Sequence, residues 1–119
     1  MILVDTSIWV DHLHQRDPEL SALLARNEVG AHNLVIGELA LGSIRNRQNF
    51  LELMTNLPRL PEAGHAEVLA FVDNHRLYGR GLSLVDAHLL AAVQLSPGSS
   101  LWTRDKRLAA VAAQLEPGA

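Results

Sequence analysis

The chain has 119 residues, of which 48% are hydrophobic and 19% charged, and its formal net charge is −3. This length and composition predict one globular domain over residues 1–119 and exclude a disordered chain. The absence of cysteine excludes disulfides and thiolate chemistry. A net negative charge is unusual for a tight nucleic-acid binder, but it does not exclude a nucleic-acid partner.

We expect a cytoplasmic protein with no membrane partner. The first residues lack the basic region and the long apolar stretch of a secretory signal. No apolar run approaches the roughly 20 residues of a membrane span.

Strand and helix patterns alternate along the chain. The expected elements are a strand at residues 1–5, helices at 6–13 and 17–26, a strand at 28–32, helices at 33–42 and 47–57, a brief strand within 57–62, helices at 63–78 and 83–95, a strand at 99–103 and a helix at 105–115. This alternation predicts an α/β fold, with a parallel sheet and helices on both of its faces.

Four acidic residues interrupt apolar segments: Asp5, Glu38, Asp86 and Asp105. Asp5 and Asp105 follow predicted strands, so both are expected at the carboxyl edge of the sheet, where such folds bind ligands. Glu38 and Asp86 have mainly apolar residues three and four positions away. That spacing predicts that both project from inward-facing helical stripes, with no capping role.

Two of the acids have an alternative structural interpretation. Asp5 is a candidate N-cap for the helix at 6–13, and Asp105 or Thr103 is a candidate N-cap for the last helix. These alternatives stay open on the sequence alone.

Four clustered carboxylates would need a cation, and an all-oxygen ligand set suits Mg²⁺ or Mn²⁺. No nucleophile motif or phosphate-binding glycine loop is present. Metal-assisted hydrolysis of phosphodiesters is the reaction that best uses such residues.

Four blocks of the sequence together resemble the PIN domain, and most closely the VapC toxins of bacterial type II toxin–antitoxin systems. The blocks are residues 2–9 (ILVDTSIW), Glu38 with Gly42, residues 81–91 (GLSLVDAHLLA) and residues 101–108 (LWTRDKRL). They cover essentially the whole chain in the family's order, and none of the family's four acidic positions is missing.

The resemblance implies an α/β/α sandwich and a Mg²⁺- or Mn²⁺-dependent ribonuclease that acts on RNA. It also implies a VapB-type antitoxin as partner, and homodimerisation. Asp5 and Asp86 match direct metal ligands, while Glu38 and Asp105 complete the site directly or through water. Thr103 matches a supporting hydroxyl, and Thr6 or Ser7 is a further candidate for that role.

Three basic residues beside Asp105 are candidate contacts to substrate phosphates: Arg104, Lys106 and Arg107. A solvated helix face is the alternative explanation for them.

Two other functions compete with the toxin hypothesis. One is a PIN nuclease of RNA processing without a toxin role. The other is a Mg²⁺-binding, receiver-like signalling domain, which disagrees with the placement of Glu38 and Asp86 on predicted helices.

Overall fold

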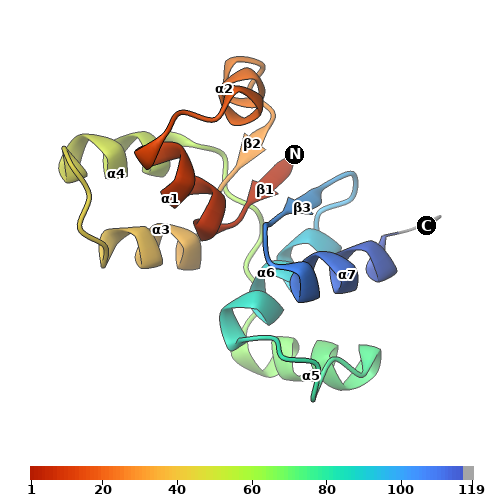
Figure 1. The fold of residues 1–119 in the computed structure, drawn as a ribbon. Helices are drawn as coiled ribbons and strands as arrows, with labels where there is room; N and C mark the ends of the chain where they lie inside the picture. The colour runs from red at the N-terminus through yellow and green to blue at the C-terminus, as the bar shows by residue number, and fades with distance from the viewer. Residues whose placement is uncertain (117–119) are drawn as a thin grey trace.

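A three-stranded parallel sheet in the order β2–β1–β3 lies at the centre of the computed structural model, which describes residues 1–116 (Figure 1). The strands are β1 (Ile2–Val4), β2 (Val29–Gly30) and β3 (Ser100–Trp102). Leu3 is paired with Gly30 on one side and with Leu101 on the other. Leu3 is also fully buried, as expected for a central parallel strand covered on both faces.

Helices flank this sheet, which confirms the predicted α/β/α sandwich. Those within the described residues are α1 (Thr6–His14), α2 (Pro18–Ala25), α3 (Asn33–Ala40), α4 (Arg47–Asn56), α5 (His65–His75), α6 (Leu84–Gln94) and α7 (Lys106–Leu115). Every predicted helix is present, with ends shifted by at most three residues. None in this part of the chain is long and apolar enough to cross a membrane.

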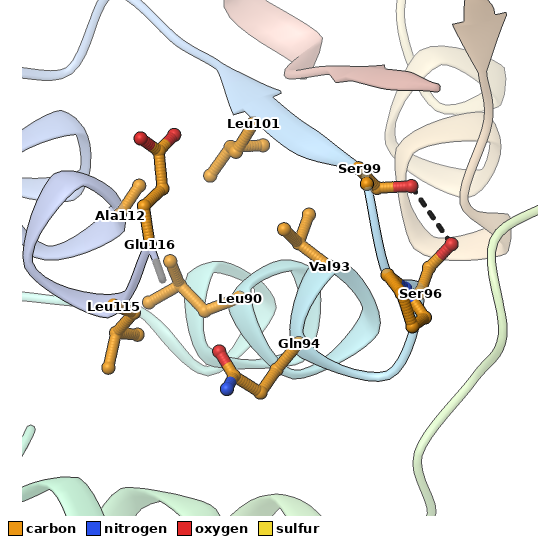
Figure 2. A pocket seen from close by; sticks show the side chains of 11 residues that line it. Leu90, Val93, Gln94, Ser96, Ser99, Leu101, Ala112, Leu115 and Glu116 are labelled. Carbon is orange, nitrogen blue, oxygen red and sulfur yellow. Dashed lines mark hydrogen bonds between the residues drawn. The ribbon is translucent and has the colours of Figure 1, made fainter. Parts of the chain in front are cut away.

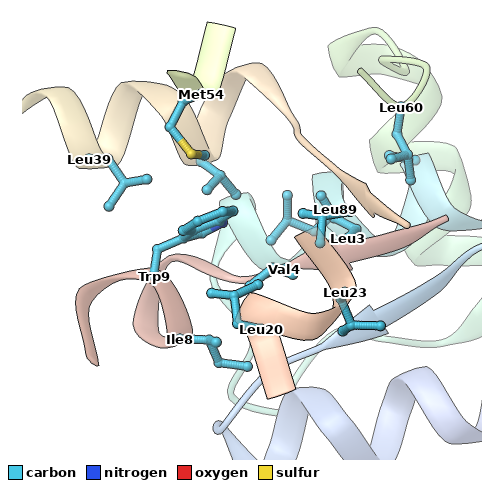
Figure 3. Close-up of a cluster of buried hydrophobic side chains, with 13 residues drawn as sticks. Leu3, Val4, Ile8, Trp9, Leu20, Leu23, Leu39, Met54, Leu60 and Leu89 are labelled. Carbon is cyan, nitrogen blue, oxygen red and sulfur yellow. The ribbon is translucent and has the colours of Figure 1, made fainter. Parts of the chain in front are cut away.

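The core explains why these short elements hold together. In the main cluster, Ile8 and Trp9 of α1 pack with Leu20 of α2, Leu39 of α3 and Met54 of α4 (Figure 3). A further cluster joins α6 and α7 and is formed by Leu77, Leu90, Leu108 and Val111. Leu101 of β3 packs against both clusters and so connects them.

The prediction of a brief strand within residues 57–62 is wrong in its extent. Only a single parallel bridge forms there, between Ala31 and Arg59. Its hydrogen bonds run from the Ala31 N–H to the Pro58 carbonyl (2.8 Å) and from the Leu60 N–H to the Ala31 carbonyl (2.9 Å). Pro58 and Pro61 have no N–H to donate, which limits further pairing on this edge.

Candidate acidic active site

Asp5 directly follows β1, at the edge where the carboxyl ends of the parallel strands meet. β2 and β3 lie on opposite sides of β1, so the direction in which strands are added to the sheet reverses at β1. α/β proteins bind ligands at the carboxyl ends of strands where this direction reverses. The Asp5 N–H donates to the Trp102 carbonyl at 2.9 Å, so the pairing with β3 continues to this residue. Its half-buried carboxylate accepts the Thr6 N–H at 2.8 Å, as an N-cap of α1.

Thr103 connects Asp5 to Asp105. Its hydroxyl donates to Asp5 Oδ2 at 2.7 Å and accepts the Asp105 N–H at 3.1 Å. Asp105 Oδ1 in turn accepts the N–H groups of Arg107 (2.9 Å) and Leu108 (3.1 Å), as the N-cap of α7. The structure therefore brings Asp5, Thr103 and Asp105 together. It also shows that Asp5 and Asp105 each cap a helix.

Glu38 reaches the same region from α3. The Thr6 hydroxyl donates to Glu38 Oε1 at 2.7 Å, across 32 positions of sequence. Since the Thr6 N–H bonds to Asp5, one continuous series of hydrogen bonds runs from Glu38 through Thr6, Asp5 and Thr103 to Asp105.

The prediction that Glu38 faces inward is wrong. Its side chain is exposed, and α3 buries Val35 and Leu39 instead. The apolar spacing around Glu38 includes Leu41, whose side chain is 91% exposed. Apolar residues three and four positions away did not predict burial of Glu38, because part of the apolar surface at this end of α3 is exposed to solvent.

The prediction that Asp86 has no capping role is also wrong. Asp86 is half-buried and belongs to a capping box: its Oδ2 accepts the Ser83 N–H at 3.0 Å, and the Ser83 hydroxyl accepts the Asp86 N–H at 3.1 Å. Sequence reasoning missed Ser83, although a serine three residues before an acid is the signature of this motif. Within residues 1–116 Asp86 forms no hydrogen bond with the other three acids.

Arg104 is held by carboxylates. Its Nε lies 2.6 Å from Asp11 Oδ2, and its Nη2 lies 3.1 Å from Asp17 Oδ2. The Leu20 N–H, followed by the Glu19 N–H and Arg104, lowers the pKa of Asp17, against an opposing effect of desolvation. These ion pairs, which sequence reasoning missed, occupy the guanidinium that had been a candidate phosphate contact.

Arg107 lies against the loop that precedes α6. A Cβ atom placed on Gly81 would be 2.6 Å from Arg107 Nη1, so the guanidinium packs directly on the glycine backbone. Lys106 and Arg107 are both exposed, and in the described part of the chain neither forms an ion pair. These two cations therefore stay available beside the start of α7.

A hollow of about 580 Å³ opens beside Glu38. It is lined by Val10 and Leu13 of α1 and by Ile44 and Arg45 of the α3–α4 loop. Another pocket, of about 80 Å³, lies between α6, β3 and α7 and includes none of the four acids (Figure 2). Of these two spaces, only the one beside Glu38 adjoins the acidic series.

The donor set fits Mg²⁺ or Mn²⁺ in its chemistry, because the four acids offer only carboxylate oxygens. No three Asp, Glu or His side chains between residues 1 and 116 lie close enough together to hold an ion among them. Mg²⁺ nevertheless keeps several waters and commonly takes one or two protein carboxylates. Two direct carboxylate ligands, with the other acids acting through water, would therefore be enough to hold the ion.

Comparison with known proteins agrees with the fold. Residues 2–114 match the PIN domain family. Two proteins named Ribonuclease VapC32, from Mycobacterium tuberculosis strains CDC 1551 / Oshkosh and ATCC 25618 / H37Rv, are each 54% identical to this chain over 114 residues, covering 96% of this chain and 92% of the relative. The chain therefore belongs to the PIN-domain family, within its VapC branch.

Proposed function

We propose that this chain is a divalent-metal-dependent endoribonuclease and the toxin of a type II toxin–antitoxin system. The observation that carries the proposal is the continuous hydrogen-bonded series from Glu38 to Asp105 at the carboxyl edge of β1 and β3. Family membership and the ribonuclease name of the relatives support the same activity. The proposal treats residues 1–119 as a single PIN domain, of which the last three residues lie outside the described part.

Asp5 and Asp86 would hold the ion directly, and Glu38 and Asp105 would act directly or through bound water. When bound, Mg²⁺ or Mn²⁺ supplies positive charge to the phosphate and makes a water molecule a better nucleophile. The carboxylates are suited to this task, because they are partly solvated at the surface of the fold and not enclosed within it.

The chain's own hydroxyls orient these carboxylates. Thr103 and the Thr6 N–H each bond one oxygen of Asp5, which fixes the plane of that carboxylate. The Thr6 hydroxyl fixes one oxygen of Glu38, and the Glu38 side chain lines the neighbouring hollow. The second oxygen of Glu38 would then be free to bind the ion or to orient the attacking water.

RNA would approach across the first turn of α7. Lys106 and Arg107 are exposed there, next to Asp105, and would contact phosphates that flank the cleaved bond. Arg104 is a weaker candidate for such a contact, since Asp11 and Asp17 already neutralise it.

The remaining alternatives differ in biological role. A PIN nuclease of RNA processing would use the same site, so the site alone does not distinguish it from a toxin. Our proposal includes the toxin role with a VapB-type antitoxin, homodimerisation and a cytoplasmic location. The receiver-like alternative is set aside, because the chain belongs to the PIN family and its middle acids lie on α3 and α6.

The activity is tested with purified protein free of antitoxin. We expect cleavage of RNA with Mg²⁺ or Mn²⁺, none with EDTA, and loss of cleavage in Asp5→Ala and Asp86→Ala. Asp73→Ala is the matched control, because Asp73 is an exposed acid on α5, outside the site. Undiminished metal-dependent cleavage by both site variants would contradict the assignment.

The toxin role needs its own experiment. Expression of the wild-type chain should stop growth, and co-expression of a cognate VapB-type antitoxin should restore it. Expression that leaves growth unaffected, combined with active RNA cleavage in vitro, would instead favour the RNA-processing alternative.

A further inference from the structure

His32 is a buried polar residue at the start of the helix that carries Glu38. Its side chain is 1% exposed, and its Nδ1 accepts the Leu34 N–H at 3.0 Å. That hydrogen bond makes His32 the N-cap of α3. The residue follows β2, whose carboxyl end lies on the same side of the parallel sheet as Asp5.

The cap works with only one form of the imidazole. To accept a hydrogen bond, Nδ1 must carry a lone pair, so the proton of the neutral ring lies on Nε2. Protonation adds a hydrogen to Nδ1, as the second N–H of the ring, and turns the acceptor into a donor. The new positive charge then faces the N–H groups at the positive end of the α3 dipole, which repel it.

The surroundings of His32 also favour the neutral form. Burial lowers the pKa of His32 below its ordinary value of 6.5, and His88 lowers it further, while Glu62 opposes them. The Nε2 atom is buried without a hydrogen-bond partner in the described residues. The surroundings therefore offer a positive charge on the ring very little compensation.

Glu38 depends on α3 for its position. The helix has eight residues, and a helix this short draws its order from caps and packing and not from its own length. Val35 and Leu39 pack into the core, and the Glu38 side chain has one hydrogen bond in the described residues, from Thr6. A change at the first turn of α3 is therefore transmitted to the Glu38 carboxylate through a short backbone segment.

We propose that His32 is a positioning residue for Glu38: the neutral imidazole sets the start of α3, and protonation displaces Glu38 from the acidic series. The effect on cleavage rests on the proposed ribonuclease function. The structural coupling between His32 and Glu38 does not, and it is tested separately.

The first experiment uses NMR of the wild-type protein without RNA or metal. At pH 7.5 the His32 ring should be the neutral Nε2–H tautomer. On acidification, the Leu34 amide and the Glu38 side-chain carboxylate should shift with the same midpoint as the His32 ring. A Nδ1–H tautomer, or Glu38 signals that do not follow the His32 midpoint, would overturn the proposal even if the protein cleaves no RNA.

The second experiment measures cleavage from pH 7.5 to 5.5. The wild-type rate should fall on the acid side by up to about tenfold per pH unit below the folded pKa of His32. His32→Asn keeps an N-cap acceptor that does not titrate, so its profile should be flatter and its activity higher than that of His32→Leu, which has no acceptor.

His12 supplies the matched control. Its Nδ1 also accepts a backbone N–H, from Asp17 at 2.9 Å, and burial also lowers its pKa, but it caps no part of α3. His12→Asn should keep the wild-type acid-side decline. If His32→Asn keeps that decline unchanged, or if His12→Asn abolishes it, the positioning role is wrong.

Discussion

The Thr103 hydroxyl donates a 2.7 Å hydrogen bond to the Asp5 carboxylate, joining residues that are 98 positions apart in the chain. The same hydroxyl accepts the Asp105 N–H at 3.1 Å. One side chain thus orients a candidate metal ligand and fixes the start of α7. Removal of a group that orients a metal ligand typically lowers metal affinity or activity by about 10- to 100-fold.

We expect Thr103→Val to reduce the cleavage rate or the apparent metal affinity by about 10- to 100-fold. Valine keeps the shape of threonine but leaves Asp5 Oδ2 without its donor. Thr103→Ser restores a hydroxyl and should recover most of the loss. Metal titrations of the cleavage rate measure the effect, and a full loss in the serine variant would show that shape, and not the hydrogen bond, matters.

Ser83→Ala should destabilise the protein by about 1 kcal/mol, because it removes the N-cap hydroxyl of α6. The same change removes one half of the capping box that holds the backbone of Asp86, so activity should also decline. Urea unfolding followed by tryptophan fluorescence gives the free energy. Ser83→Asp, which retains a capping oxygen, should be as stable as the wild type to within a few tenths of a kcal/mol.

Arg107→Gln should weaken RNA binding. It should also reduce the slope of the logarithm of the binding constant against the logarithm of salt concentration by about one. Arg104→Gln should leave that dependence nearly unchanged, because Asp11 and Asp17 already pair with this guanidinium. Binding is measured over a salt series, in Ca²⁺ to prevent cleavage. Equal slopes for the two variants would contradict the distinction between these arginines.

Gly81→Ala should cost about as much stability as Gly79→Ala. Both glycines have positive φ, +79° and +71°, so each alanine costs about 1–2 kcal/mol for the left-handed backbone. At Gly81 the new Cβ also meets Arg107, but that side chain is exposed and flexible and can move away at little cost, whereas the space around Gly79 is open. Thermal unfolding of the two variants compares these costs, and a clearly larger cost at Gly81 would show that the Arg107 contact constrains the loop.

The free energy of unfolding should decrease as the pH falls below about 6.5. Burial is the main cause of the lowered pKa of both His12 and His32, so the unfolded chain binds protons at a higher pH than the folded chain does. Stability from these groups is therefore complete above 6.5 and is lost as the pH drops through their folded pKa values. Urea titrations between pH 7.5 and 5 test this, and a His12→Asn, His32→Asn double variant should respond less.

Local sequence signals were sufficient for the secondary structure. The apolar segment at residues 1–5, the Asp17–Pro18 helix start and the glycines after residue 78 each act on the backbone within a few positions, so they predicted elements close to those observed. The bridge at Ala31 and Arg59 was harder to predict, because proline reduces pairing without abolishing it.

The sequence by itself determined the family, the α/β/α fold and the chain order of the four acids, since these depend on residue types and on short-range spacing. Only the tertiary structure decided that Glu38 is exposed and bonded to Thr6, that Arg104 is paired with Asp11 and Asp17, and that His32 is buried. Those facts depend on which helix faces pack together and on contacts between residues far apart in the chain. Helical periodicity describes one element at a time and carries no information about the neighbour that covers it.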